Sequence, residues 1–135
     1  MDAVDPTKVA RGNRTTAAPG GINWDGDGDN EYMFGTSWAD ILSGDNGDDL
    51  LYGFEGDDFI EGGFGGDKIF GDAGDDILWA NTEDNFGYGD GYGDSVGNLL
   101  SGGSGNDRMY GSNSADALFG GPGHDLLYGG HGRDD

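Results

Sequence analysis

Residues Gly44–Trp79 read GDNGDDLLY, GFEGDDFIE, GGFGGDKIF and GDAGDDILW, four nonapeptides joined without a spacer. Each unit has glycine at its first and fourth positions, aspartate at its sixth and an aliphatic residue at its eighth. The sixth residues are Asp49, Asp58, Asp67 and Asp76, and the eighth residues are Leu51, Ile60, Ile69 and Leu78. A fixed period of this kind predicts a solenoid in which each nonapeptide is one structural unit.

The two parts of each nonapeptide predict different local structures. The six glycine-rich residues can take positive φ and turn tightly, which gathers backbone carbonyls around one point. The sixth-position aspartate adds a carboxylate, and carbonyl and carboxylate oxygens are the ligands that Ca²⁺ prefers. The last three residues, such as Leu50-Leu51-Tyr52, predict a short strand whose middle side chain points inward.

The repeat continues less regularly on both sides of this stretch. Irregular units begin at Gly26, Gly35, Gly93 and Gly111, and regular units begin at Gly102 and Gly120. We expect a flexible N-terminal segment at 1–25, a first repeat region at 26–79, an insert at 80–92, and a second repeat region at 93–135 whose last repeat is truncated. The eighth positions predict a core made of Met33, Leu42, Leu51, Ile60, Ile69, Leu78, Leu100, Met109, Leu118 and Leu127.

The composition is strongly acidic and rich in glycine. The 135 residues include 31 Gly, 27 acidic and 6 basic residues and no Cys, for a net charge of −21. This balance argues against nucleic acid or an anionic membrane as a partner, and no apolar run is long enough to span a bilayer. High charge with low hydrophobicity favours disorder, but periodic carboxylates could be neutralised by cations, so we expect folding to depend on metal.

The nonapeptide resembles GGxGxDxUx, the repeat of the RTX (repeats-in-toxin, haemolysin-type) family. The resemblance implies an all-β fold, a right-handed parallel β-roll with two nonapeptides per turn and several calcium ions between stacked loops. Loops that face each other across one ion would then lie eighteen residues apart. The metal-binding residues implied are Asp40, Asp49, Asp58, Asp67, Asp76, Asp107, Asp116, Asp125 and Asp134, with Gly44, Gly53, Gly62, Gly71, Gly102 and Gly120.

The same spacing ranks the implied calcium sites. Regular loops stand on both sides of the pairs Asp49 with Asp67, Asp58 with Asp76, and Asp107 with Asp125. A weaker or truncated loop enters the pairs Asp40 with Asp58, Glu31 with Asp49, and Asp116 with Asp134, and Asn98 with Asp116 lacks one charge.

The expected function is a calcium-binding module of an exported protein that folds on calcium binding and is not itself an enzyme. No HExxH or GxSxG motif is present. No N-terminal signal peptide is expected, and the resemblance implies type I secretion to the extracellular space. Two alternatives remain open: a C-terminal stabilising or secretion module of a secreted hydrolase of protease or lipase type, with a fused or upstream catalytic domain, or an adhesin that uses outward aromatic residues at the ninth position.

Overall fold

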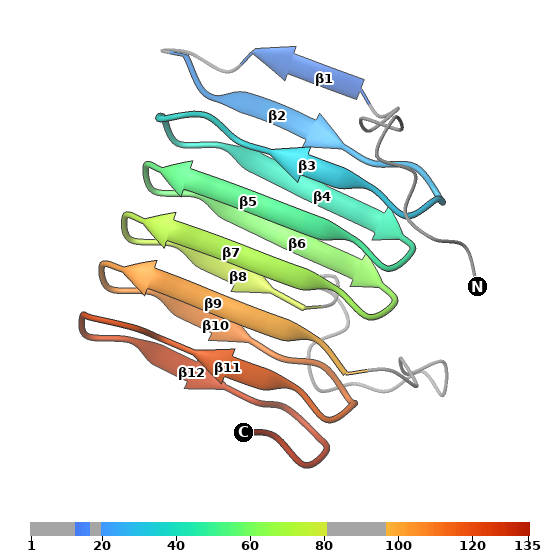
Figure 1. Cartoon of the computed structure of the whole chain (residues 1–135), viewed down its shortest axis with the longest axis vertical. Coiled ribbons are helices and arrows are strands. Elements are labelled where there is room, and N and C mark those ends of the chain that lie inside the picture. The colour runs from blue at the N-terminus through green and yellow to red at the C-terminus, as the bar shows by residue number, and fades with distance from the viewer. Residues whose placement is uncertain (1–12, 17–19, 81–96) are drawn as a thin grey trace.

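The computed structural model describes residues 13–16, 20–80 and 97–135, and within these ranges the chain forms twelve strands and no helix that could cross a membrane. Figure 1 shows two facing sheets, with the chain passing from one sheet to the other after each strand from β2 onward. One sheet contains, in order, β1 (Asn13–Thr16), β2 (Ile22–Asp25), β4 (Ile41–Asn46), β6 (Phe59–Phe64), β8 (Ile77–Trp79), β10 (Arg108–Tyr110) and β12 (Leu126–Tyr128). The other contains β3 (Tyr32–Phe34), β5 (Leu50–Glu55), β7 (Lys68–Ala73), β9 (Leu99–Ser104) and β11 (Ala117–Phe119).

Neighbouring strands from β2 onward are parallel and lie one full turn apart in the sequence. Leu42 of β4 pairs with Ile60 of β6, and Leu51 of β5 pairs with Ile69 of β7. Each of these pairs joins equivalent positions of units that are two nonapeptides apart, which keeps every eighth side chain on the inner face. The predicted parallel β-roll with two nonapeptides per turn is therefore confirmed.

The roll continues across the interruption of the repeat. Ile69 of β7 pairs with Leu100 of β9, and Leu78 of β8 pairs with Met109 of β10. These partners are 31 residues apart instead of 18, and the difference equals the thirteen-residue insert that the sequence predicts. The sequence placed the insert at 80–92, and residues 81–96 lie outside the described part of the chain. Ala80 itself is buried, and its N–H donates to the Tyr110 carbonyl at 2.8 Å.

The inner face of the roll is lined by the eighth-position side chains. Nine of the ten expected core residues are buried: Met33, Leu42, Leu51, Ile60, Ile69, Leu78, Leu100, Met109 and Leu118. The prediction for Leu127 was wrong, because this side chain remains 41% exposed. Leu127 lies in β12, which ends its sheet among the described residues and has β10 on one side.

Two described strands precede residue 26, where the sequence placed the start of the repeats. Strand β2 pairs in parallel with β4, with Trp24 opposite Leu42, and β1 pairs antiparallel with the outer edge of β2. Trp24 and Ile22 both belong to the core. Trp24 stands eighteen residues before Leu42, and Gly20 takes the left-handed φ of 132° that the fourth-position glycines share. The eighteen-residue spacing between Trp24 and Leu42 could have revealed this earlier unit in the sequence.

Candidate metal-binding loops

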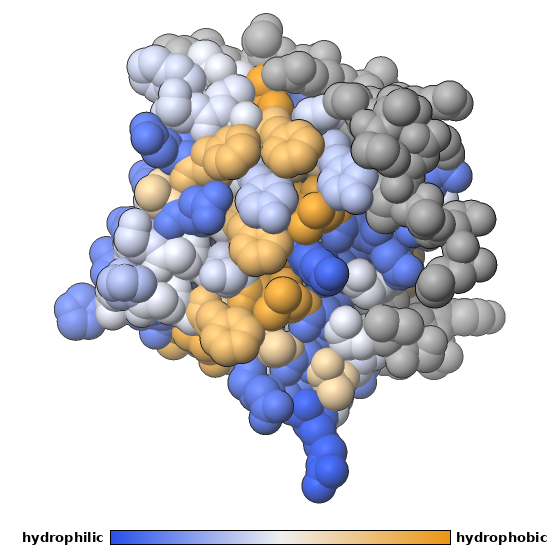
Figure 2. Space-filling view, viewed as in Figure 1, coloured by the Kyte–Doolittle hydropathy of each residue, from blue (hydrophilic) through white to orange (hydrophobic). Residues whose placement is uncertain are grey.

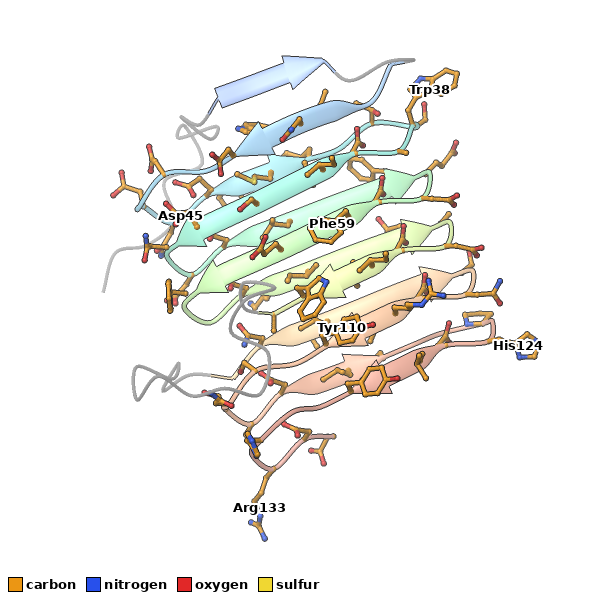
Figure 3. All side chains as sticks on the ribbon, turned by 180° about the vertical axis from the view of Figure 1, so that it is seen from behind. Trp38, Asp45, Phe59, Tyr110, His124 and Arg133 are labelled. Atoms are coloured by element: carbon orange, nitrogen blue, oxygen red, sulfur yellow. The ribbon has the colours of Figure 1, made fainter. Side chains whose placement is uncertain are left out.

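The glycine-rich segments of the units stack along the two edges of the roll. Segments that lead from the seven-stranded sheet to the five-stranded sheet form one edge, and segments that lead back form the other. In Figure 3, Asp45 of segment 44–49 lies at one edge, while Trp38 of segment 35–40 and His124 of segment 120–125 lie at the opposite edge. Segments eighteen residues apart are therefore direct neighbours along one edge.

A ladder of hydrogen bonds connects the sixth positions along each edge. The N–H of Asp49 donates to Oδ1 of Asp67 at 2.9 Å, and the N–H of Asp58 donates to Oδ1 of Asp76 at 2.8 Å. The structure brings together all seven pairs that the spacing predicts: Glu31 with Asp49, Asp49 with Asp67, Asp40 with Asp58, Asp58 with Asp76, Asn98 with Asp116, Asp107 with Asp125, and Asp116 with Asp134.

Three further hydrogen bonds of these ladders were not predicted from the sequence. Asp67 donates its N–H to Asn98 Oδ1 and Asp76 donates its N–H to Asp107 Oδ1, so both ladders cross the insert. The N–H of Ile22 donates to Oδ1 of Asp40 at 2.6 Å, which extends one ladder into the earlier unit. Adding the thirteen inserted residues to the eighteen-residue spacing would have found the first two.

The second oxygen of several of these aspartates is buried without a hydrogen-bond donor. This holds for Oδ2 of Asp49, Asp58, Asp76 and Asp107, whose side chains are only 1–2% exposed. Burial is the main cause that raises the pKa of Asp49 to about 8 and those of Asp58 and Asp76 to about 7, and nearby carboxylates raise them further. The pKa of Asp107 is raised for the same reasons. A buried carboxylate oxygen without a partner is costly, and a cation would relieve that cost.

The first-position glycines leave space beside these orphaned oxygens. A Cβ atom on Gly44 would collide with Oδ2 of Asp49 and with the carbonyl oxygen of Gly62 in the next turn. A Cβ atom on Gly53 would meet Oδ2 of Asp58 and the Gly71 carbonyl oxygen in the same way. A carboxylate and a carbonyl from successive turns thus converge at each of these points, and this donor set fits a hard cation such as Ca²⁺.

The other glycines singled out from the sequence stand in the same relation to a carboxylate. A Cβ atom on Gly62 or Gly71 would collide with Oδ2 of the aspartate five residues later and approach a carbonyl of the next turn. At Gly102 and Gly120 the collision is with the carboxylates of Asp107 and Asp125. In the described part of the chain, no three His, Asp or Glu side chains are grouped to hold a metal. Each loop supplies one sixth-position carboxylate, so most ligands of a bound cation would have to be backbone carbonyls.

The outward aromatic residues form stacked ladders. On the five-stranded sheet, Tyr52 stacks on Phe34 with ring centroids 5.8 Å apart and on Phe70 at 4.7 Å. On the other sheet, Tyr110 stacks on Trp79 at 4.0 Å and on Tyr128 at 5.2 Å. Figure 2 shows apolar side chains gathered down the face of the five-stranded sheet. The rings stack on one another, yet Phe34, Phe119 and Tyr128 remain 42–57% exposed, so an adhesin that uses these side chains stays a prediction.

Comparison with known families identifies the repeat independently of the geometry. A family model described as the RTX calcium-binding nonapeptide repeat (4 copies) matches residues 25–53, 34–69, 52–87, 92–127 and 110–135. These overlapping segments include both sides of the insert and cover most of the chain. No curated protein matches the chain.

Proposed function

Since the chain belongs to the RTX calcium-binding nonapeptide repeat family, we propose that it is a calcium-binding β-roll module of an exported protein and that calcium drives its folding. One observation carries the proposal. Buried, orphaned Oδ2 atoms of sixth-position aspartates lie beside carbonyl oxygens of the next turn, at points where a glycine leaves room.

The electrostatics of the roll explain why a cation would drive folding. Closing the roll buries the carboxylates of Asp49, Asp58 and Asp76 next to other carboxylates, in a chain whose net charge is already −21. Burying a charge without a counter-charge costs several kcal/mol in proteins. Calcium bound between turns neutralises that charge, so the free energy of ion binding becomes free energy of folding.

Named groups of this chain would hold the ions. Oδ2 of Asp58 and the carbonyl of Gly71 would act on one edge, and Oδ2 of Asp49 and the carbonyl of Gly62 on the other. Oδ1 of Asp49 accepts the N–H of Glu31 and Oδ1 of Asp58 accepts the N–H of Asp40, and these hydrogen bonds of the ladder fix the orientation of each carboxylate. Each carboxylate therefore links successive turns twice, once through its own ladder and once through the ion.

The cellular role follows from where calcium is abundant. Modules with Kd values of about 10⁻⁴–10⁻³ M are empty in the cytosol and filled outside the cell. The chain would remain unfolded during export and close into the roll afterwards. We assign it a structural role without catalysis, in support of whatever domain it is joined to.

The test is a calcium titration of the full chain from a chelated start, followed by far-UV circular dichroism. We expect a cooperative gain of β signal with calcium and none with magnesium, which is smaller and demands a strict octahedral shell. A chain that is fully folded in chelator would overturn calcium-driven folding. A chain that shows neither binding nor folding at saturating calcium would overturn the calcium-binding function itself.

A further inference from the structure

Two loops of the roll share a structure that differs from that of the loops with a glycine at the fourth position. They are segment 35–40 (GTSWAD) and segment 111–116 (GSNSAD), which we call the hydroxyl loops. Both have a hydroxyl residue at the second position, Thr36 or Ser112, and both lack the fourth-position glycine. Seven other segments keep that glycine, and we call them the open loops: 44–49, 53–58, 62–67, 71–76, 102–107, 120–125 and 129–134.

In the first hydroxyl loop, Thr36 saturates the carboxylate of Asp40. The Thr36 N–H donates to Oδ2 of Asp40 at 2.5 Å, and its hydroxyl lies 3.1 Å from Oδ1 and 3.2 Å from Oδ2. The same hydroxyl oxygen accepts the N–H of Trp38 at 3.1 Å. Asp40 is 1% exposed, yet neither of its oxygens lacks a donor.

The second hydroxyl loop repeats this arrangement on the opposite edge of the roll. The Ser112 N–H donates to Oδ2 of Asp116 at 2.5 Å, and the Ser112 hydroxyl lies 3.0 Å from Oδ2 and 3.2 Å from Oδ1. The Ser112 hydroxyl oxygen accepts the N–H of Ser114 at 3.1 Å. Two loops of different sequence, more than 70 residues apart, thus share one hydrogen-bond pattern.

The backbone separates the two classes of loop as clearly as the side chains do. In all seven open loops the second residue has a φ between 74° and 106°, and the fourth-position glycine has a φ between 120° and 156°. Thr36, Trp38, Ser112 and Ser114 are not among the described residues with positive φ. With no glycine at the fourth position, the loop takes an ordinary backbone path that brings the second residue's N–H to the carboxylate.

We propose that the hydroxyl loops bind no calcium and that Thr36 and Ser112 take the place of the ion at Asp40 and Asp116. The inference rests on the proposed calcium-binding function. It divides the loops into those that bind an ion and those that do not. Four aspartates of the open loops, Asp49, Asp58, Asp76 and Asp107, keep an orphaned Oδ2 for the cation, whereas the hydroxyl loops supply their own donors. Asp40 and Asp116 then leave the set of calcium ligands implied by the sequence, and a glycine at the fourth position marks a loop that can take an ion.

Counting bound calcium ions on the full chain tests the proposal, by equilibrium dialysis or titration calorimetry. Asp40→Asn and Asp58→Asn make a matched pair on one edge, and Asn98 shows that asparagine fits the sixth position of the ladder. We expect Asp58→Asn to bind one ion fewer than the wild-type chain and Asp40→Asn to bind the same number. Loss of an ion from Asp40→Asn in a folded chain would overturn the proposal.

A second pair of variants tests whether the hydroxyl replaces calcium or ligates it. Thr36→Val and Ser112→Ala remove the hydroxyls, and we expect an unchanged ion count with a lower stability in circular dichroism. An ion count that falls by one in either variant would make the hydroxyl a calcium ligand and overturn the proposal. The double variant Thr36→Gly with Trp38→Gly recreates an open loop, and we expect it to bind one additional ion.

The two proposals fail in different ways. A wild-type chain that binds no calcium overturns the proposed function and the division of its sites together. A wild-type chain that binds calcium, combined with ion loss from Asp40→Asn, overturns only the assignment of the hydroxyl loops.

Discussion

The middle of the roll and its C-terminal end carry the same repeat but differ in how completely they are packed. Leu51 in β5 and Leu127 in β12 both occupy the eighth position, yet Leu51 is fully buried and Leu127 is 41% exposed. Strand β5 lies between β3 and β7, whereas β12 is an edge strand among the described residues, with β10 on one side. The repeat sets the direction in which a side chain points, but its burial depends on a neighbouring turn on each side.

The largest expected effect comes from truncating these two leucines. Leu51→Ala should lower the free energy of unfolding by about 2–5 kcal/mol, because the cavity lies between two fixed turns. Leu127→Ala should cost less than about 1 kcal/mol, since the side chain is already partly in water. Urea unfolding at saturating calcium measures both. Equal costs would mean that the last turn is covered in solution, for instance by a second copy of the chain.

The buried carboxylates in the middle of the roll predict an unusual pH dependence in the absence of calcium. Folding raises the pKa values of Asp49, Asp58 and Asp76 to between about 7 and about 8, above the ordinary value of 3.8. The calcium-free roll should therefore be most stable in acid, below pH 4, and lose that stability as pH rises through 7 to 8. Each such carboxyl contributes at most about 1.4 kcal/mol per pH unit.

Circular dichroism in chelator at a series of pH values checks this dependence. Calcium affinity should change in the opposite direction, rising with pH as the same carboxyls lose their protons. Asp58→Asn removes one titrating group and should flatten the dependence, whereas Asp45→Asn, at an exposed carboxylate that is not a named cause of these pKa shifts, serves as the control. A calcium-free chain that becomes less folded on acidification would contradict the assigned pKa shifts.

Most of the fold could be read from the spacing of a few residue types. The period of nine, with aliphatic residues at the eighth position, predicted the burial of Leu51 and Ile69, and the turn of two nonapeptides implied by the RTX resemblance predicted their pairing. Trp24 was missed because its unit has Ile22 at the sixth position instead of aspartate. The buried side chains of Ile22 and Trp24 hold this unit in the roll, although it has no aspartate at the sixth position.

The sequence predicted which residues of the candidate site lie in neighbouring loops, but not which of their carboxylate oxygens already have a hydrogen-bond donor. The resemblance to the RTX repeat implied that Asp58 and Asp76 lie in facing loops, but not the hydrogen bond between them. It could not show that Thr36 saturates Asp40, because that contact depends on the backbone path taken when the fourth position is not glycine. A hydroxyl at the second position indicates a loop of this kind only when the residue at the fourth position is not glycine.

The smallest expected effect concerns backbone strain, which also differs between the middle and the end. In the middle of the roll the left-handed second positions include Asp45, Phe54 and Asp72, with φ of 74°, 82° and 74°. In the open loops of the C-terminal part the same positions are all glycine: Gly103, Gly121 and Gly130. Left-handed backbone costs a non-glycine residue about 1–2 kcal/mol, somewhat less for Asp. The folded roll therefore holds that strain at Asp45, Phe54 and Asp72.

Asp45→Gly and Asp45→Ala separate this strain from charge. Both remove the same exposed carboxylate, but only glycine accepts the left-handed φ without a steric penalty. We expect the glycine variant to be more stable than the alanine variant by about 1 kcal/mol in urea unfolding at saturating calcium. If the two variants unfold at the same urea concentration, the loop relaxes around a Cβ atom. The left-handed backbone would then not require a glycine at the second position of the C-terminal loops.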